Sequence, residues 1–134
     1  MPFTHRLRVR FGECDPQNIV FNSHYLAYAD VALTELQREA FGSYAQMIEA
    51  HGVDLVVAEA QVRYRAPARF DDLLDITLTV SNLGTTSMTI AFEVSRDGDL
   101  LVEGELRYVF VDAASWAKAP ISDQLRAVLA AYAA

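Results

Sequence analysis

A short loop with an acidic side chain is the part of the sequence with the clearest potential for chemistry. Residues 12–18 are rich in turn-forming types, and the proline after Asp15 keeps that residue away from helical dihedrals. Seven residues after Asp15, Asn22 stands where a long helical pattern begins. A carboxylate can serve as a base or a nucleophile, and the free N–H groups at a helix N-terminus favour developing negative charge. The loop and the helix together indicate a site where a carboxylate lies near a place that stabilises negative charge on an oxygen.

The same residues also have a purely structural interpretation, which the sequence leaves open. Asp15 can cap a turn, and Asn22 can cap the helix. In the chemical interpretation, the N–H groups of about Asn22, Ser23 and His24 have no partner inside the helix and form an oxyanion site.

Several other kinds of site are absent from the sequence. It contains no Gly-x-x-x-x-Gly-Lys phosphate loop, no Gly-x-Gly-x-x-Gly motif, no Gly-x-Ser-x-Gly elbow and no His-Glu-x-x-His motif. The histidines His5, His24 and His51 lie in different predicted elements, and no cysteine and histidine spacing is typical of zinc ligation. We therefore expect no metal site.

The elements that position the loop follow from the periodicity of the apolar residues. Alternation predicts five strands, at residues 4–11, 53–66, 73–83, 87–96 and 100–111. Spacings of three and four predict a main helix over 23–41, capped by Asn22 or Ser23, a short helix between Ser43 and Gly52, and a last helix over 122–132. The four later strands are expected to form an antiparallel meander. The whole chain, 1–134, is then a single α+β domain whose sheet curves around the main helix.

Composition narrows the partners and the compartment. The 134 residues are 52% hydrophobic, which is enough for a core, and their formal charge of −7 repels nucleic acid and anionic membranes. No run of about 18 apolar residues predicts a membrane span, and the single cysteine, Cys14, favours the reducing cytoplasm. Because long strands leave an unpaired sheet edge, we expect a homodimer or a homotetramer.

Two stretches of the sequence resemble one protein family. Residues 10–35 look like the signature of the hotdog-fold acyl-CoA thioesterases of the 4-hydroxybenzoyl-CoA thioesterase type. The matching residues are Asp15-Pro16, Ile19-Val20-Phe21, Tyr25, Asp30 and Glu35. Residues 64–73 are similar to the Pro-x-x-x-x-Asp segment that lies between strands in this family. The order of the predicted elements agrees over nearly the whole chain.

The resemblance implies a hotdog fold, in which an antiparallel five-stranded sheet wraps around a long central helix. It implies dimers that continue the sheet, with the active site at the subunit interface. The implied reaction is hydrolysis of an acyl- or aroyl-CoA thioester to a free acid and coenzyme A, without a cofactor, since coenzyme A is part of the substrate. Asp15 would act as general base or nucleophile, and the Asn22 amide would polarise the thioester carbonyl. A non-catalytic acyl-CoA or acyl-carrier binding module on the same fold is the alternative.

Residues of the main helix are expected to contact the substrate. Ser23 and His24 lie at its N-terminus, and Tyr25 is placed to line an acyl pocket as well as to pack in the core. The resemblance puts Asp30 at an acidic helix position that approaches the acyl group in the aroyl branch of the family. Helical spacing puts the same residue at the edge of the polar face, where the alternative is a carboxylate that faces solvent or a subunit interface.

Charged residues elsewhere are expected near the same site. Arg63 and Arg65, two residues apart, should share one face of a strand, where they either bind the phosphates of coenzyme A or face solvent. Glu13, two residues before Asp15, is expected on the same face of an extended chain as Asp15.

Overall fold

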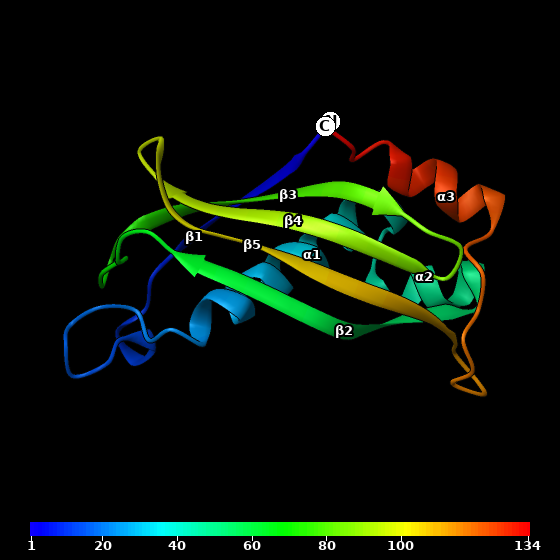
Figure 1. Cartoon of the computed structure of the whole chain (residues 1–134), viewed down its shortest axis with the longest axis horizontal. Coiled ribbons are helices and arrows are strands. Elements are labelled where there is room, and N and C mark those ends of the chain that lie inside the picture. Colours follow the sequence, from blue (N-terminus) through cyan, green and yellow to red (C-terminus); the bar gives the residue numbers. More distant parts are fainter.

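A long helix, α1 (His24–Phe41), lies against one face of a five-stranded antiparallel sheet. In the computed structural model, which describes residues 1–134, Figure 1 looks through the sheet onto α1 behind it. The strands are β1 (Phe3–Arg8), β2 (Val53–Tyr64), β3 (Leu73–Leu83), β4 (Ser87–Arg96) and β5 (Asp99–Asp112). The other elements are a 3-10 turn, η1 (Phe11–Glu13), and two short helices, α2 (Tyr44–His51) and α3 (Asp123–Ala130). The predicted α+β class and hotdog arrangement are confirmed.

The order of the strands in the sheet is β1-β3-β4-β5-β2. Strands β3, β4 and β5 form the predicted antiparallel meander, but the prediction that β2 joins it beside β3 is wrong. Strand β2 pairs instead with β5, from Val53 opposite Asp112 to Tyr64 opposite Val102. The connection from β2 to β3 contains Pro67 and is too long for a tight hairpin, so it carries the chain to the other side of the sheet.

The face of α1 that meets the sheet is the predicted apolar stripe. Its buried apolar residues are Tyr25, Tyr28, Ala29, Ala32, Leu33 and Leu36. They form one cluster with alternate residues of the central strands, among them Ile76, Ile90, Phe92, Leu106 and Phe110. Only alternate residues of each strand join this cluster, because successive side chains of a strand point to opposite faces of the sheet.

Capping signals explain the ends of the short helix but not the start of α1. Ser43 Oγ accepts the Gln46 N–H at 3.0 Å, and Gly52 ends α2 with a φ of 67°, as predicted. Ser23 precedes α1 with a helical backbone (φ −71°, ψ −20°), and no side chain caps this end. An N-cap side chain reaches the free N–H groups from an extended backbone, so the predicted cap by Asn22 or Ser23 is wrong.

The first strand is shorter than predicted. It ends at Arg8, and the chain then turns into η1. Phe11 is 79% exposed as a result, although alternation placed it on the apolar face of the strand. The turn also changes the direction of the residues that follow, which include those of the candidate site.

The two chain ends lie side by side (Figure 1), and the amino group of Met1 donates to Ala131 O at 2.6 Å. No helix of the chain has both the length and the apolar character needed to cross a membrane.

Candidate active site

The chain between β1 and α1 closes into a narrow loop. The Asp15 N–H donates to Ile19 O at 2.9 Å, and at the base of the loop the Phe21 N–H donates to Glu13 O at 2.9 Å. Asn18 turns the chain with a φ of 65°, a left-handed conformation that asparagine tolerates better than most residues. The loop therefore places Asp15 near its tip and brings the chain back to the start of α1.

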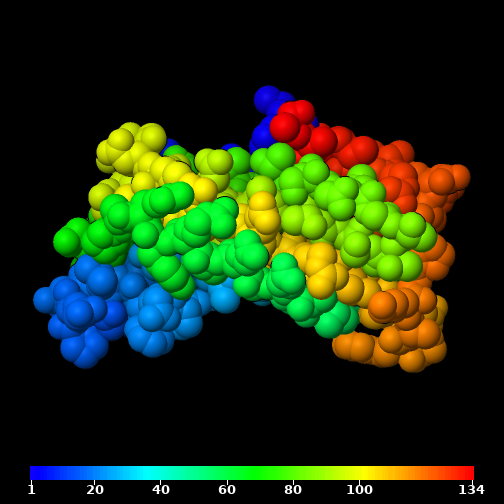
Figure 2. All heavy atoms as spheres, in the orientation of Figure 1, coloured from blue at the N-terminus to red at the C-terminus, as the bar shows by residue number.

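The loop reaches the opposite edge of the sheet, because the sheet curves around α1. Figure 2 shows it as a blue projection at one end of the molecule, beneath the green surface of the chain around the end of β2. The Val20 N–H donates to Ala68 O at 2.9 Å, and the Ala68 N–H donates to the Tyr25 hydroxyl at 3.1 Å. Loop, helix and the connection between β2 and β3 are thus joined through Ala68.

The Asp15 carboxylate is only partly used by the local structure. Its Oδ1 accepts the Gln17 N–H at 2.8 Å, which is the turn-capping role of the structural interpretation. Its other oxygen, Oδ2, has no hydrogen-bonding or ionic partner in the chain. One carboxylate therefore both holds the turn and keeps an oxygen free for chemistry.

Several N–H groups are free at the start of α1, among them those of Asn22 and Ser23. The N–H groups of Asn22 and Ser23 donate to no acceptor in the chain. His24 differs from the prediction, because its N–H donates to Phe21 O at 2.9 Å. The phenol of Tyr64 donates to Asn22 O at 3.1 Å, so the end of β2 holds this turn from the other side.

Asp15 and Asn22 line the same cavity, which has a volume of about 340 Å³. It lies between the loop, the start of α1 and the end of β2. Its lining residues are Asp15, Gln17, Ile19, Val20, Asn22, Tyr25, Tyr64, Arg65, Ala66 and Pro67. Asp15, with a free carboxylate oxygen, and Asn22, with an unpaired N–H group, thus border one space, which is the arrangement that attack on a carbonyl group requires.

Of the other predicted residues, Tyr25 and Arg65 also line this cavity. Arg63 does not, but its guanidinium and that of Arg65 contact the same oxygen, Oε1 of Glu103, at 3.6 and 3.7 Å. The two arginines therefore share one face, as predicted. Arg65 therefore places a guanidinium at the rim of the cavity, and Arg63 lies beside it on the shared carboxylate of Glu103.

Besides Arg63, three of the predicted residues lie outside this cavity. The side chains of Ser23 and His24 do not line it. Asp30 lines a second cavity, of about 320 Å³, between α1, α2 and β2, where Tyr108 and Gln37 also lie.

Glu13 does not share a face with Asp15, and that prediction is wrong. The prediction assumed an extended chain, whereas η1 turns Glu13 toward the interior, where its carboxylate pairs with Arg10. Glu13 lines a different cavity, together with Arg10 and Tyr28.

Residues for which the sequence predicted no role in the site complete the lining of this cavity. They are Gln17, Ile19, Val20, Tyr64, Ala66 and Pro67. For Tyr64, Ala66 and Pro67, the only indication in the sequence was the family resemblance of residues 64–73. No group of three or more histidine, cysteine or acidic side chains is arranged to hold a metal ion.

Comparison with known proteins identifies a family and several relatives that this chain resembles. A family model described as the thioesterase-like superfamily matches residues 9–129. The chain is 33% identical over 111 residues to the acyl-CoA thioester hydrolase YbgC of Escherichia coli O157:H7, covering 82% of each chain. It is 29% identical over 111 residues to a putative esterase of Aquifex aeolicus, covering 83% of this chain and 86% of that one. A solved structure of a thioesterase superfamily protein from Jannaschia sp. CCS1 superimposes with a TM-score of 0.91 at 25% identity, covering 98% of this chain and 93% of that one.

Proposed function

This chain belongs to the thioesterase-like superfamily, and on that premise we propose that it hydrolyses an acyl- or aroyl-CoA thioester to a free acid and coenzyme A. The observation that carries the proposal is the cavity that joins Asp15, whose carboxylate has one free oxygen, to Asn22, whose N–H is unpaired. Hydrolysis of a thioester needs an attacking group and a place for the negative charge that develops on the carbonyl oxygen. The proposed reaction needs no further cofactor.

In the proposed reaction, the thioester carbonyl oxygen points to the N–H group of Asn22. The free oxygen of Asp15 takes a proton from a water molecule while the water oxygen attacks the carbonyl carbon, and an electron pair moves onto the carbonyl oxygen. When the carbonyl re-forms, the C–S bond breaks, and the coenzyme A thiolate leaves and takes up a proton. Attack by the Asp15 oxygen itself, through an anhydride that water then hydrolyses, gives the same products.

The size of the cavity limits what part of the substrate it can take. Its volume of about 340 Å³ lies near the lower end of the range for ligand sites, roughly 300 to 1,000 Å³. We therefore place only the reacting end of the thioester in the cavity, against Tyr25 and Ile19, and leave the nucleotide end at the surface. The guanidinium of Arg65 at the rim, with that of Arg63 beside it, is where we place the phosphates.

We expect Arg65→Ala to raise KM for an acyl-CoA about three- to fivefold, while kcat stays within about twofold. This rise in KM corresponds to a loss of roughly 1 kcal/mol in binding free energy, the size expected for one half-exposed charge. The reason is that Arg65 attracts phosphates and touches no reacting atom. The measurement is steady-state hydrolysis of an acyl-CoA beside the same acyl group on pantetheine, which lacks the nucleotide. Arg107→Ala removes an exposed arginine of β5 outside the cavity and serves as the control. An equal rise in KM with the pantetheine substrate would contradict this role.

We also propose that two copies of the chain associate along β2. This strand is 12 residues long and forms an edge of the sheet, and Val57 and Tyr64 on it are 52% and 53% exposed. Pairing with a second copy would satisfy the free backbone groups of the edge. Sedimentation of the pure protein would contradict the proposal if it showed only a species of 14.9 kDa.

The proposed activity is tested by the release of free thiol from short, medium, long and aromatic acyl-CoAs. We expect turnover of at least one class, with acid and coenzyme A formed in equal amounts. Binding of acyl-CoA without thiol release from any of them would instead favour the alternative, a non-catalytic acyl-CoA or acyl-carrier binding module.

A further inference from the structure

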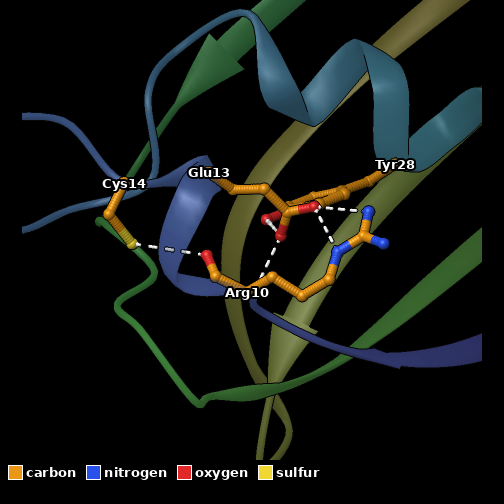
Figure 3. Close-up of polar contacts among 4 residues, drawn as sticks. All are labelled: Arg10, Glu13, Cys14 and Tyr28. Carbon is orange, nitrogen blue, oxygen red and sulfur yellow. Dashed lines mark hydrogen bonds and ion pairs between the residues drawn. The ribbon is translucent and has the colours of Figure 1, made fainter.

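Glu13 is the only charged residue among the buried residues of the chain, with 8% of its surface exposed. Burial of a carboxylate is costly unless hydrogen bonds and an opposite charge compensate it. Four hydrogen bonds compensate the Glu13 carboxylate (Figure 3). Its Oε1 accepts the Arg10 backbone N–H at 2.8 Å and the Tyr28 hydroxyl at 2.9 Å. Its Oε2 accepts Arg10 Nε at 2.9 Å and Arg10 Nη2 at 2.7 Å. Both oxygens are therefore fully engaged.

These contacts keep Glu13 ionised. Burial alone would raise the pKa of the Glu13 carboxyl, but the hydrogen bonds from the Arg10 backbone and guanidinium and from Tyr28 outweigh it and hold the pKa below its usual range. Burial and the bond to this carboxylate raise the pKa of the Tyr28 hydroxyl, which therefore remains a donor.

Glu13 lies at the base of the loop that carries Asp15. Its own carbonyl oxygen accepts the Phe21 N–H at 2.9 Å, one residue before Asn22, and it precedes Asp15 by two residues. Its side chain ties that base to the chain after β1 through Arg10 and to the second turn of α1 through Tyr28. Glu13 therefore joins the base of the loop to the chain after β1 and to α1, yet it does not line the cavity of Asp15.

We propose that Glu13 is a positioning residue of the thioesterase reaction, whose carboxylate anchors the base of the loop to Tyr28 and so sets the Asp15 carboxylate relative to the Asn22 N–H. The proposal rests on the proposed function, because it assigns Glu13 an effect on turnover. A residue that only stabilised the fold would affect turnover with or without Asp15. The proposed role of Glu13 affects turnover only through the placement of the Asp15 carboxylate.

Glu13→Gln tests the proposal, because glutamine keeps the size of the side chain but loses the charge that holds Arg10. We expect kcat to fall about tenfold or more, since a displacement of roughly 1 Å can cost up to about 100-fold, and KM to stay within about twofold. Tyr28→Phe, which removes one donor and leaves the ion pair, should give a smaller loss of kcat and serves as a second variant if the first does not fold. Glu39→Gln is the control, because Glu39 also accepts from a tyrosine hydroxyl, that of Tyr132 at 2.8 Å, but is exposed on α1.

Two readouts separate positioning from a loss of stability. In an Asp15→Asn background, Glu13→Gln should cause no further loss of the residual rate, because the group it positions is already disabled. A further loss of similar size would overturn the proposal. Hydrogen exchange at the amides of Asp15 and Phe21, measured without substrate, should be faster in Glu13→Gln and unchanged in Glu39→Gln. Unchanged exchange in Glu13→Gln would also overturn it.

The exchange measurement keeps the two proposals apart. If the parent protein released no thiol from any acyl-CoA, the proposed function would fail, and the exchange rates would still decide whether Glu13 orders the loop. If the parent turned over and Glu13→Gln kept its full kcat, the proposed function would stand and the positioning role would fail.

Discussion

Asp15→Asn is expected to lower kcat for thioester hydrolysis about 1,000-fold, within the range of roughly 100- to 10,000-fold that a positioned acid or base contributes, with KM changed less than about threefold. The new side chain can still accept the Gln17 N–H, so the turn that Asp15 Oδ1 now holds should survive. What it lacks is the basic carboxylate oxygen that has no partner in the chain, and this loss affects water activation and direct attack alike. The measurement is steady-state thiol release by the folded variant, with folding checked by circular dichroism.

Asp112→Asn is the matched control for this substitution. Asp112 Oδ2 likewise accepts backbone N–H groups in a turn, those of Ala114 at 3.1 Å and Ser115 at 2.8 Å, but it does not line the cavity of Asp15. We expect its activity to stay within about twofold of the parent. A comparable loss in both variants, or retention of more than about a tenth of the activity by Asp15→Asn, would return Asp15 to the role of a turn residue.

Gly104→Ala is expected to destabilise the protein by about 3 kcal/mol, at the upper end of the usual cost of overpacking. Gly104 lies on β5 between Val62 of β2 and Phe92 of β4. A Cβ atom there would lie 2.1 Å from the backbone oxygen of Gln61 and 2.7 Å from Cε1 of Phe92. The first neighbour is backbone, so β2 itself would have to move, and the second is a ring packed in the core.

The measurement for Gly104→Ala is thermal unfolding, where we expect Tm to fall by roughly 10 °C for a chain of this length. Gly12→Ala is the control, because no atom lies within 4 Å of a Cβ built on Gly12. Its Tm should be unchanged or slightly higher, since alanine restricts the unfolded chain. Equal Tm values for the two variants would show that β2 adapts to the extra methyl group without cost.

Local periodicity was sufficient to predict the strands that pair with their neighbours in sequence. The predicted bounds of β3 and β4 match the structure, because both alternate over their whole length and end at turn residues. The partner of β2 could not be predicted in this way. Its alternation would suit a place beside β3 or beside β5, and only the wrapping of the whole sheet around α1 decides between them.

The site was predictable only where it is local. Asp15 and Asn22 lie in one continuous loop and helix start, so their residue types and spacing indicated a shared site. Tyr64 and Pro67, on the opposite wall, come from more than 40 residues later, and their contribution depends on the tertiary fold. Glu13 was misplaced because alternation holds for an extended chain, and three residues of 3-10 turn are enough to rotate a side chain away from the expected face.

The strand order also bears on how the chain folds. The β3–β4–β5 meander forms from neighbouring segments, whereas β1 must find β3, with Phe3 opposite Leu78, and β2 must find β5, with Val53 opposite Asp112. Closure of such long loops is entropically costly, so we expect the meander to form first and both edge strands to dock later, an order that pulse-labelled hydrogen exchange during refolding would reveal. The walls of the Asp15 cavity come from the chain after β1 and from the end of β2. Catalytic competence would then be the last property the refolding chain regains, and folding intermediates would be inert toward substrate.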